Sequence, residues 1–349
     1  MGIVEKGKVL VTGANGYIAM HVVDQLLKGG YSVRGTVRSE SKIKYIQDYF
    51  KSYGDKLELV VVPDITKEGA FDNYVSDVDA IEHTASPFTM QIDDPNEVIA
   101  PAVAGTTSVL QSAVLHGKNV KRIVVTSSTG AVLEVDTGKT TFTEDDWNDQ
   151  AIRIVEEKGS AADAPSKYRA SKTLAERAAW KVAELHKDSF ELTTICPPFV
   201  YGPPIHEING GSEGLNQSLK DWFNIVLKGT KDSDKEFLAK VGSSWVDVRD
   251  VAKAHVLALK TVDAGGQRII VSTGAWKWQD WINIARTFAS EVAAGAADTY
   301  KPDEAVHDFL YNTEKAKRIF ELDSSILISR ETSVQDMLSK FKERNLQWP

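Results

Sequence analysis

Seven β-branched segments, most of them separated by helical patterns, constrain the fold more than any other feature of this sequence. They are KVLVT (8–12), YSVRGTV (31–37), LELVVV (57–62), VDAIEHTA (78–85), KRIVVTSS (121–128), ELTTICP (191–197) and QRIIVST (267–273). Strands that alternate with helices pair in parallel through right-handed crossovers, and the helices cover both faces of the sheet. The sequence therefore predicts an α/β fold with a Rossmann-type, doubly wound parallel sheet.

Amphipathic patterns fill most of the intervals between these segments. We expect helices at 16–30, 39–54, 66–75, 95–117, 165–187, 215–229, 246–260, 276–293 and 333–345.

The alternation loosens after residue 200, where the Gly/Pro-rich segment 201–214 begins. We expect residues 1–200, with a contribution from 246–273, to form an NADP-binding Rossmann domain. Residues 201–245 and 274–349 are then expected to form a smaller, discontinuous C-terminal substrate lobe.

Composition excludes several classes of function. A net charge of −8, without a dense Lys/Arg stripe, argues against nucleic acid or an anionic membrane as a partner. Cys196 is the only cysteine, and the seven histidines are too scattered to predict a metal site. No apolar run approaches the roughly 20 residues that span a bilayer, and from the lysine-interrupted first residues we expect no cleaved signal peptide. We expect a cytoplasmic protein with a small-molecule partner, and the residues leave open a monomer or a homodimer.

The first strand runs directly into the turn TGANGYIAM (12–20), which has glycines at 13 and 16 and a small residue, Ala19. Such a turn lets backbone N–H groups and a helix N-terminus approach a pyrophosphate, whereas a bulky side chain would block that approach. A helix-starting turn without a ligand is the alternative. The position between a strand and a helix favours a dinucleotide site.

The ends of the next strands indicate which dinucleotide is bound. Enzymes that use NAD usually carry Asp or Glu at the end of the second strand, but GTVRSESK places Arg38 and Lys42 there, where they can bind a 2′-phosphate. A solvated helix start is the alternative. Asp64 in VVPDIT is placed to accept from an adenine or to cap a helix, and small residues such as Thr84 in HTASPF leave room for the cofactor. NADP(H) is the predicted cofactor.

Hydroxyl groups end the fifth strand in TSSTG (126–130), and only one of Ser127 and Ser128 can face the ligand crevice. Tyr168 and Lys172 then follow at helical i, i+4 spacing, so that they share one helix face. A carbonyl that accepts a hydride needs a proton donor, and a serine can orient that carbonyl. A free tyrosine has a pKa of about 10, which a nearby cation brings toward working pH.

A second pair with the same spacing, Tyr311 and Lys315 in YNTEK, lacks this context. No strand-tip hydroxyl precedes it, and an ordinary amphipathic turn follows. We expect this second pair to be structural.

Four motifs together resemble the extended short-chain dehydrogenases/reductases over nearly the whole chain: TGANGYIA (12–19), TSS (126–128), YRASK (168–172) and PPFVYGP (197–203). A narrower similarity is to the dihydroflavonol-reductase-like branch, and within it to fungal NADPH-dependent aldehyde/ketone (methylglyoxal or 3-methylbutanal) reductases. The segments that carry it are GTVRSESK (35–42), VVPDIT (61–66), HTASPF (83–88), FTEDDWN (142–148) and VDVRDVAKAH (246–255).

This resemblance implies roles for individual residues. Ser128 would be the catalytic serine, Tyr168 the proton donor, and Lys172 the residue that binds the nicotinamide ribose and lowers the tyrosine pKa. The implied cofactor residues are Gly13, Ala14, Asn15, Gly16, Tyr17 and Ile18 at the pyrophosphate, Arg38 and Lys42 at the 2′-phosphate, Asp64 and Ile65 at the adenine, and Pro197, Val200 and Ser218 at the nicotinamide. The implied substrate residues are Phe88, Thr129, Leu133 and Phe199.

The main interpretation is an NADPH-dependent carbonyl reductase that converts aldehydes or ketones to alcohols by hydride transfer. One alternative is a nucleotide-sugar epimerase of the same fold, which Arg38 and Lys42 disfavour because such enzymes generally retain NAD. The other is a non-catalytic NADP-sensing module, which the intact set of Ser128, Tyr168 and Lys172 disfavours.

Overall fold

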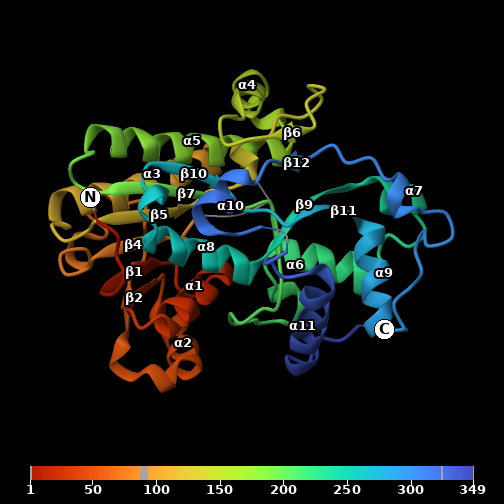
Figure 1. The fold of residues 1–349 in the computed structure, drawn as a ribbon, viewed down its shortest axis with the longest axis horizontal. Helices are drawn as coiled ribbons and strands as arrows, with labels where there is room; N and C mark the ends of the chain where they lie inside the picture. The colour runs from red at the N-terminus through yellow and green to blue at the C-terminus, as the bar shows by residue number, and fades with distance from the viewer. Residues whose placement is uncertain (1, 87–92, 324, 349) are drawn as a thin grey trace.

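A seven-stranded parallel sheet forms the centre of the structure, a computed structural model that describes residues 2–86, 93–323 and 325–348 (Figure 1). The strand order is β10-β7-β5-β4-β1-β2-β3, and every neighbouring pair is parallel. The strands are β1 (Lys8–Thr12), β2 (Ser32–Val37), β3 (Leu57–Val61), β4 (Ala80–His83), β5 (Arg122–Thr126), β7 (Glu191–Cys196) and β10 (Gln267–Ile270). The order reverses between β1 and β4, so their carboxyl ends border the crevice where doubly wound folds bind ligands.

Helices cover the sheet on both faces. α3 (Asn96–His116) and α5 (Ala164–Leu185) pack against each other on one face, and α1 (Tyr17–Lys28) and α8 (Val248–Lys260) pack on the other (Figure 1). The remaining α-helices are α2 (Ile43–Tyr49), α4 (Asp149–Lys158), α6 (Gln217–Trp222), α7 (Lys235–Lys240), α9 (Trp278–Phe288), α10 (Glu314–Phe320) and α11 (Arg330–Glu343).

Helix α3 departs from the expectation that no segment is long and apolar enough to span a bilayer. It has 21 residues and a mean hydropathy of 1.5, which meets the requirements of length and composition. Half of that stretch is buried inside the protein, where α3 packs against α5. Core helices of α/β proteins have this same character.

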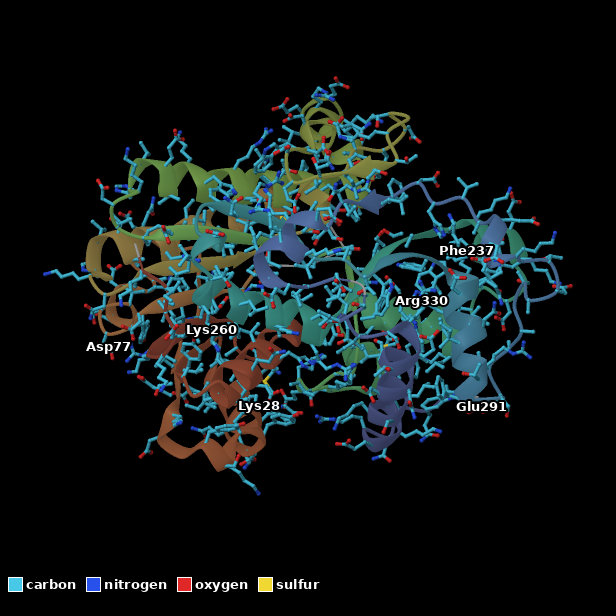
Figure 2. All side chains as sticks on the ribbon, viewed as in Figure 1. Lys28, Asp77, Phe237, Lys260, Glu291 and Arg330 are labelled. Atoms are coloured by element: carbon cyan, nitrogen blue, oxygen red, sulfur yellow. The ribbon has the colours of Figure 1, made fainter. Side chains whose placement is uncertain are left out.

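Beyond the main sheet, a three-stranded sheet packs against α9 and α11 (Figure 1). Its strands are β8 (Phe199–Tyr201), β9 (Gly242–Asp247) and β11 (Gly274–Lys277). Aromatic rings fill its core: Trp281 lies 4.9 Å from the ring centroids of both Tyr201 and Trp245. The Arg330 guanidinium, at the start of α11, lies 5.3 Å from the Trp281 ring (Figure 2).

The predicted α/β class and all seven strands of the main sheet are confirmed. The helix predicted at 66–75 is wrong, because Gly69 turns the chain with φ of +73° and only a 3₁₀ turn at Asp72–Tyr74 forms. The helix predicted at 39–54 is reduced to α2 and flanking 3₁₀ turns. Helices α4, α7 and α10 were not predicted. The division into two lobes stays a prediction, since one continuous core joins α1, α8 and α9.

Trp281 lies at the centre of the aromatic cluster on the three-stranded sheet. Trp281→Ala removes a fully buried ring at the centre of this cluster and should lower the free energy of unfolding by about 3–5 kcal/mol. Phe288→Ala, on the same helix but 40% exposed, is the control and should cost about 1 kcal/mol or less. Urea unfolding measures both, and equal losses would contradict the proposed role of the cluster.

Candidate active site

The turn after β1 has the tight geometry that its glycines predict. Gly13 has φ of +65°, and a Cβ atom there would lie 3.1 Å from the Cβ of Ala85. The Ala14 N–H donates to the Thr36 carbonyl at 2.8 Å, which joins the turn to β2. Gly16 precedes α1, and no side chain caps the first N–H groups of that helix. Both Gly13 and these N–H groups fit a pyrophosphate at this position.

The other residues of this turn differ in how far they are buried. Tyr17 is buried, and its hydroxyl donates to the Gly202 carbonyl at 2.9 Å, so its side chain ties α1 to the segment after β8. Ala14 is also buried and lies close to Gly35. A Cβ atom added to Gly35 would lie 2.7 Å from the Cβ of Ala14. Asn15 and Ile18 are partly exposed.

The tips of β1 and β4 are held together through Thr12. Its hydroxyl accepts from the N–H groups of Thr84 and Ala85 at 3.2 and 3.1 Å and lies 2.9 Å from His83 Nδ1. The Thr84 hydroxyl donates to the Thr12 carbonyl at 2.5 Å. Thr84 is therefore fixed at the ligand crevice.

The residues predicted to bind the adenosine end lie beyond β2 and β3. Arg38 is exposed, whereas the Lys42 ammonium pairs with Glu207 at 2.9 Å. Asp64 accepts from the N–H and hydroxyl of Thr66 at 2.9 and 2.6 Å, and these bonds, with the charge of Arg38, lower the Asp64 pKa. Asp64 thus stabilises a turn rather than capping a helix. Ile65 packs toward Gly105 of α3.

The two serines after β5 face different surroundings. Ser127 is buried and donates to Glu176 of α5 at 2.6 Å. Ser128 has an extended backbone, with φ of −161°, and its hydroxyl accepts from the Gly130 N–H at 3.0 Å. Of the two serines, Ser128 is the one left on the crevice side.

Ser128 and Tyr168 lie close together at Gly130, in the turn after β5, and Lys172 lies beside the Tyr168 ring. A Cβ atom on Gly130 would lie 3.2 Å from Ser128 Oγ and 3.5 Å from Tyr168 Cε1. The Lys172 ammonium lies 5.8 Å from the Tyr168 ring centroid and donates to Ser86 Oγ at 3.0 Å. A side chain at Gly130 would therefore come into close contact with Ser128 Oγ and into contact with the Tyr168 ring.

A buried carboxylate that the sequence reasoning missed anchors the helix that carries Tyr168 and Lys172. Glu176 accepts from Ser127 at 2.6 Å, from Thr194 of β7 at 2.8 Å and from Arg268 of β10 at 2.7 Å. The Arg268 guanidinium also stacks on the Trp147 ring at 3.6 Å. Glu176 follows Tyr168 and Lys172 at i+8 and i+4, so the helical period of the sequence could have revealed it.

Of the residues predicted at the nicotinamide end, Pro197 contacts this turn, and Val200 and Ser218 contact each other. The Pro197 carbonyl accepts from the Thr129 N–H at 3.0 Å, and the Ser218 hydroxyl donates to the Val200 carbonyl at 3.0 Å.

The remaining predicted substrate residues differ in exposure. Leu133 is buried in a small core with Phe142 and Cys196. Phe199 is 43% exposed beside Trp276. Phe88 lies outside the described residues.

The second tyrosine–lysine pair does not share a helix face. Tyr311 belongs to β12 (Leu310–Tyr311), which pairs with β6 (Thr141–Phe142), whereas Lys315 lies in α10. The spacing of this pair is therefore coincidental. Tyr311 nevertheless reaches the catalytic region, because its hydroxyl lies beside the Thr129 side chain and the charge of Arg169 acts on it.

Comparisons with known proteins agree with this geometry. The sequence model of the NAD dependent epimerase/dehydratase family matches residues 9–274. An NADPH-dependent methylglyoxal reductase of Saccharomyces cerevisiae is 35% identical, over 79% of this chain and 81% of that protein. A ketoreductase of Aspergillus niger is 34% identical, over 91% of this chain and 92% of that protein.

Solved structures show the same architecture. The Gre2 protein of Candida albicans, in complex with NADPH, superposes with a TM-score of 0.84 at 30% identity, over 96% of this chain and 98% of that chain. Vestitone reductase from alfalfa superposes with a TM-score of 0.77 at 25% identity, over 98% of this chain and 100% of that chain.

Substitution of Ser127 and of Ser128 should change the stability of the protein by different amounts. Ser127→Ala removes a hydrogen bond to a buried carboxylate and should lower the free energy of unfolding by about 1.5–3 kcal/mol. Ser128→Ala removes only a partly exposed bond to a backbone N–H and should cost less than about 1 kcal/mol. Chemical unfolding of the two variants measures the difference, and a larger loss for Ser128→Ala would reverse the assignment.

Proposed function

Because this chain belongs to the NAD dependent epimerase/dehydratase family, we propose that it is an NADPH-dependent carbonyl reductase of the short-chain dehydrogenase/reductase type. It reduces aldehydes or ketones to alcohols, with Tyr168 as the proton donor. The observation that carries this proposal is the proximity of Ser128 and Tyr168 at Gly130, after the carboxyl end of β5, with Lys172 beside the Tyr168 ring. The similarity to methylglyoxal reductases and ketoreductases supports the same chemistry.

Each of the three side chains has one task in the proposed mechanism. NADPH, when bound, supplies the hydride that reduces the carbonyl carbon. Ser128 holds the carbonyl oxygen and stabilises its growing negative charge. Tyr168 transfers its hydroxyl proton to that oxygen, and the nearby Lys172 ammonium stabilises the phenolate that remains.

The residues at the dinucleotide end fit NADP(H). A Cβ atom at Gly13 would lie 3.1 Å from Ala85 on a left-handed backbone, and one at Gly35 of β2 would lie 2.7 Å from the Ala14 Cβ, so both positions around the turn favour glycine. The exposed Arg38 can bind a 2′-phosphate without first losing another partner. Lys42 would have to leave Glu207, so we assign the larger part of the selectivity to Arg38.

The two alternatives have less support. Superposition on epimerases, such as UDP-glucuronic acid 4-epimerase of Bacillus cereus at 15% identity, shows only a common fold. The two relatives described above, at 35% and 34% identity, are named as reductases. The presence of Ser128, Tyr168 and Lys172 in one cluster argues against a non-catalytic sensor. A cytoplasmic location stays a prediction.

Tyr168→Phe tests the proton donor. Loss of the hydroxyl should lower kcat for aldehyde or ketone reduction by at least about 100-fold, because general acid catalysis typically contributes that much. The Kd for NADPH, measured by the change in cofactor fluorescence, should change less than about threefold. Near-normal turnover in this variant would refute the role of Tyr168.

Arg38→Asp tests the choice of cofactor. The variant should weaken NADPH binding by about 10- to 100-fold and leave NADH binding nearly unchanged, because only NADPH carries the 2′-phosphate. Lys51→Asp is the control, since it makes the same change of charge at an exposed position after α2. A ratio of NADPH to NADH affinity that is the same in both variants would place the 2′-phosphate elsewhere.

A further inference from the structure

Two polar groups beside the catalytic pair have hydrogen-bonding capacity that the described residues do not use. Arg169, the residue after Tyr168, is partly exposed, and its guanidinium forms neither an ion pair nor a hydrogen bond with any described residue. The Tyr311 hydroxyl is buried beside the Thr129 side chain, and no described group accepts its proton in a well-aligned hydrogen bond. Buried polar groups are nearly always satisfied, so such a group at a functional site calls for a ligand.

Arg169 lies on the side of Gly130 that faces Ser128 and Tyr168. The Cβ position of Gly130 is 3.2 Å from Ser128 Oγ, 3.5 Å from Tyr168 Cε1 and 3.6 Å from Arg169 Cγ. The stem of Arg169 therefore borders the same space as the serine and the tyrosine. From there its charge acts on Tyr311, whose hydroxyl lies beside Thr129.

The electrostatic surroundings also favour a negatively charged or oxygen-rich ligand. Burial lowers the pKa of the Arg169 guanidinium, which means that the protein only partly compensates its charge. Asp163 is the acidic residue whose charge acts on Arg169, but its carboxylate already accepts two bonds from Ser166 at 2.8 Å. Burial likewise raises the pKa of Tyr311, so this hydroxyl stays protonated and can donate.

We propose that Arg169 and Tyr311 form a carboxylate-binding subsite that selects substrates with a carboxylate next to the reacting carbonyl. The proposal rests on the function proposed above and names its substrate class. Arg169 binds the carboxylate, and Tyr311, which reaches the site from β12, donates a further hydrogen bond. The Thr129 side chain lies beside the Tyr311 hydroxyl. The bound carboxylate thereby orients the reacting carbonyl toward Ser128 and Tyr168.

Two probes of the same size test this subsite. In 2-oxo-4-phenylbutanoate a carboxylate replaces the methyl group of 4-phenyl-2-butanone, so the two compounds differ only at the proposed contact. Arg169→Met should lower kcat/KM for the keto acid by about 10- to 100-fold, the range expected for loss of a charge-assisted hydrogen bond. It should change kcat/KM for the ketone by less than about threefold.

Arg177→Met is the matched control, because Arg177 lies on the same helix but pairs with Asp149 at 2.6 Å. It should leave the ratio of the two kcat/KM values unchanged. If Arg169→Met lowers both values equally, or if the wild-type protein reduces the ketone but not the keto acid, the subsite is refuted.

Tyr311→Phe separates a role in binding from a role in folding. Removal of an unsatisfied buried hydroxyl should leave the Tm unchanged or raise it, while kcat/KM for the keto acid falls by about 2- to 10-fold. Tyr300→Phe is the control and should lower the Tm, because the Tyr300 hydroxyl donates to Asp280 at 2.8 Å. A lower Tm for Tyr311→Phe, with no change in selectivity between the two probes, would assign Tyr311 to the core.

Binding in the absence of turnover distinguishes this proposal from the proposed function. With NADP⁺ bound no hydride is available, so titration calorimetry of 2-oxo-4-phenylbutanoate reports binding alone. The Kd should rise about 10- to 100-fold in Arg169→Met. If the wild-type protein reduces neither probe but this loss of binding is seen, the proposed reaction fails and the subsite stands. If the Kd does not change, the subsite fails whatever the rates show.

Discussion

The hydrogen bond between Ser127 and Glu176 is the contact on which the geometry of the site depends. It joins the end of β5 to the middle of α5 at 2.6 Å, inside the protein. The bond turns Ser127 toward the core and leaves Ser128 on the crevice side. Arg268 adds a buried cation at 2.7 Å, so the carboxylate is paired as well as hydrogen-bonded. The helix that carries Tyr168 and Lys172 is thereby fixed against the strand tips.

The site also depends on the part of the chain that follows the main sheet. The two-residue strand β12 pairs with β6 and delivers Tyr311 to the turn that begins at Ser128. Arg169 reaches the same region from α5. The pair Tyr168 and Lys172, which we propose to be catalytic, thus has two neighbours: Arg169 from the same helix and Tyr311 from a distant segment of the sequence. We attribute substrate selection to these neighbours rather than to the pair itself.

Local patterns predicted much of the molecule, because periodicity, glycine turns and strand-tip hydroxyls act over short distances. The parallel sheet, the turn at Gly13 and the shared face of Tyr168 and Lys172 all follow from such patterns. The helix predicted at 66–75 failed because the left-handed backbone of Gly69 outweighed its apolar spacing. The position of Tyr311 could not be predicted, since β12 exists only through its pairing with a segment about 170 residues earlier.

Transfer of deuterium from labelled NADPH to the product is the direct test of carbonyl reduction by hydride transfer. The protein is incubated with 4-phenyl-2-butanone and NADPH that carries deuterium at both C4 positions, and the product is analysed by mass spectrometry and NMR. We expect one NADP⁺ to form for each alcohol molecule, and each alcohol to carry one deuterium on its carbinol carbon. An alcohol without deuterium, or no consumption of NADPH with this ketone or with a panel of aldehydes, would contradict it.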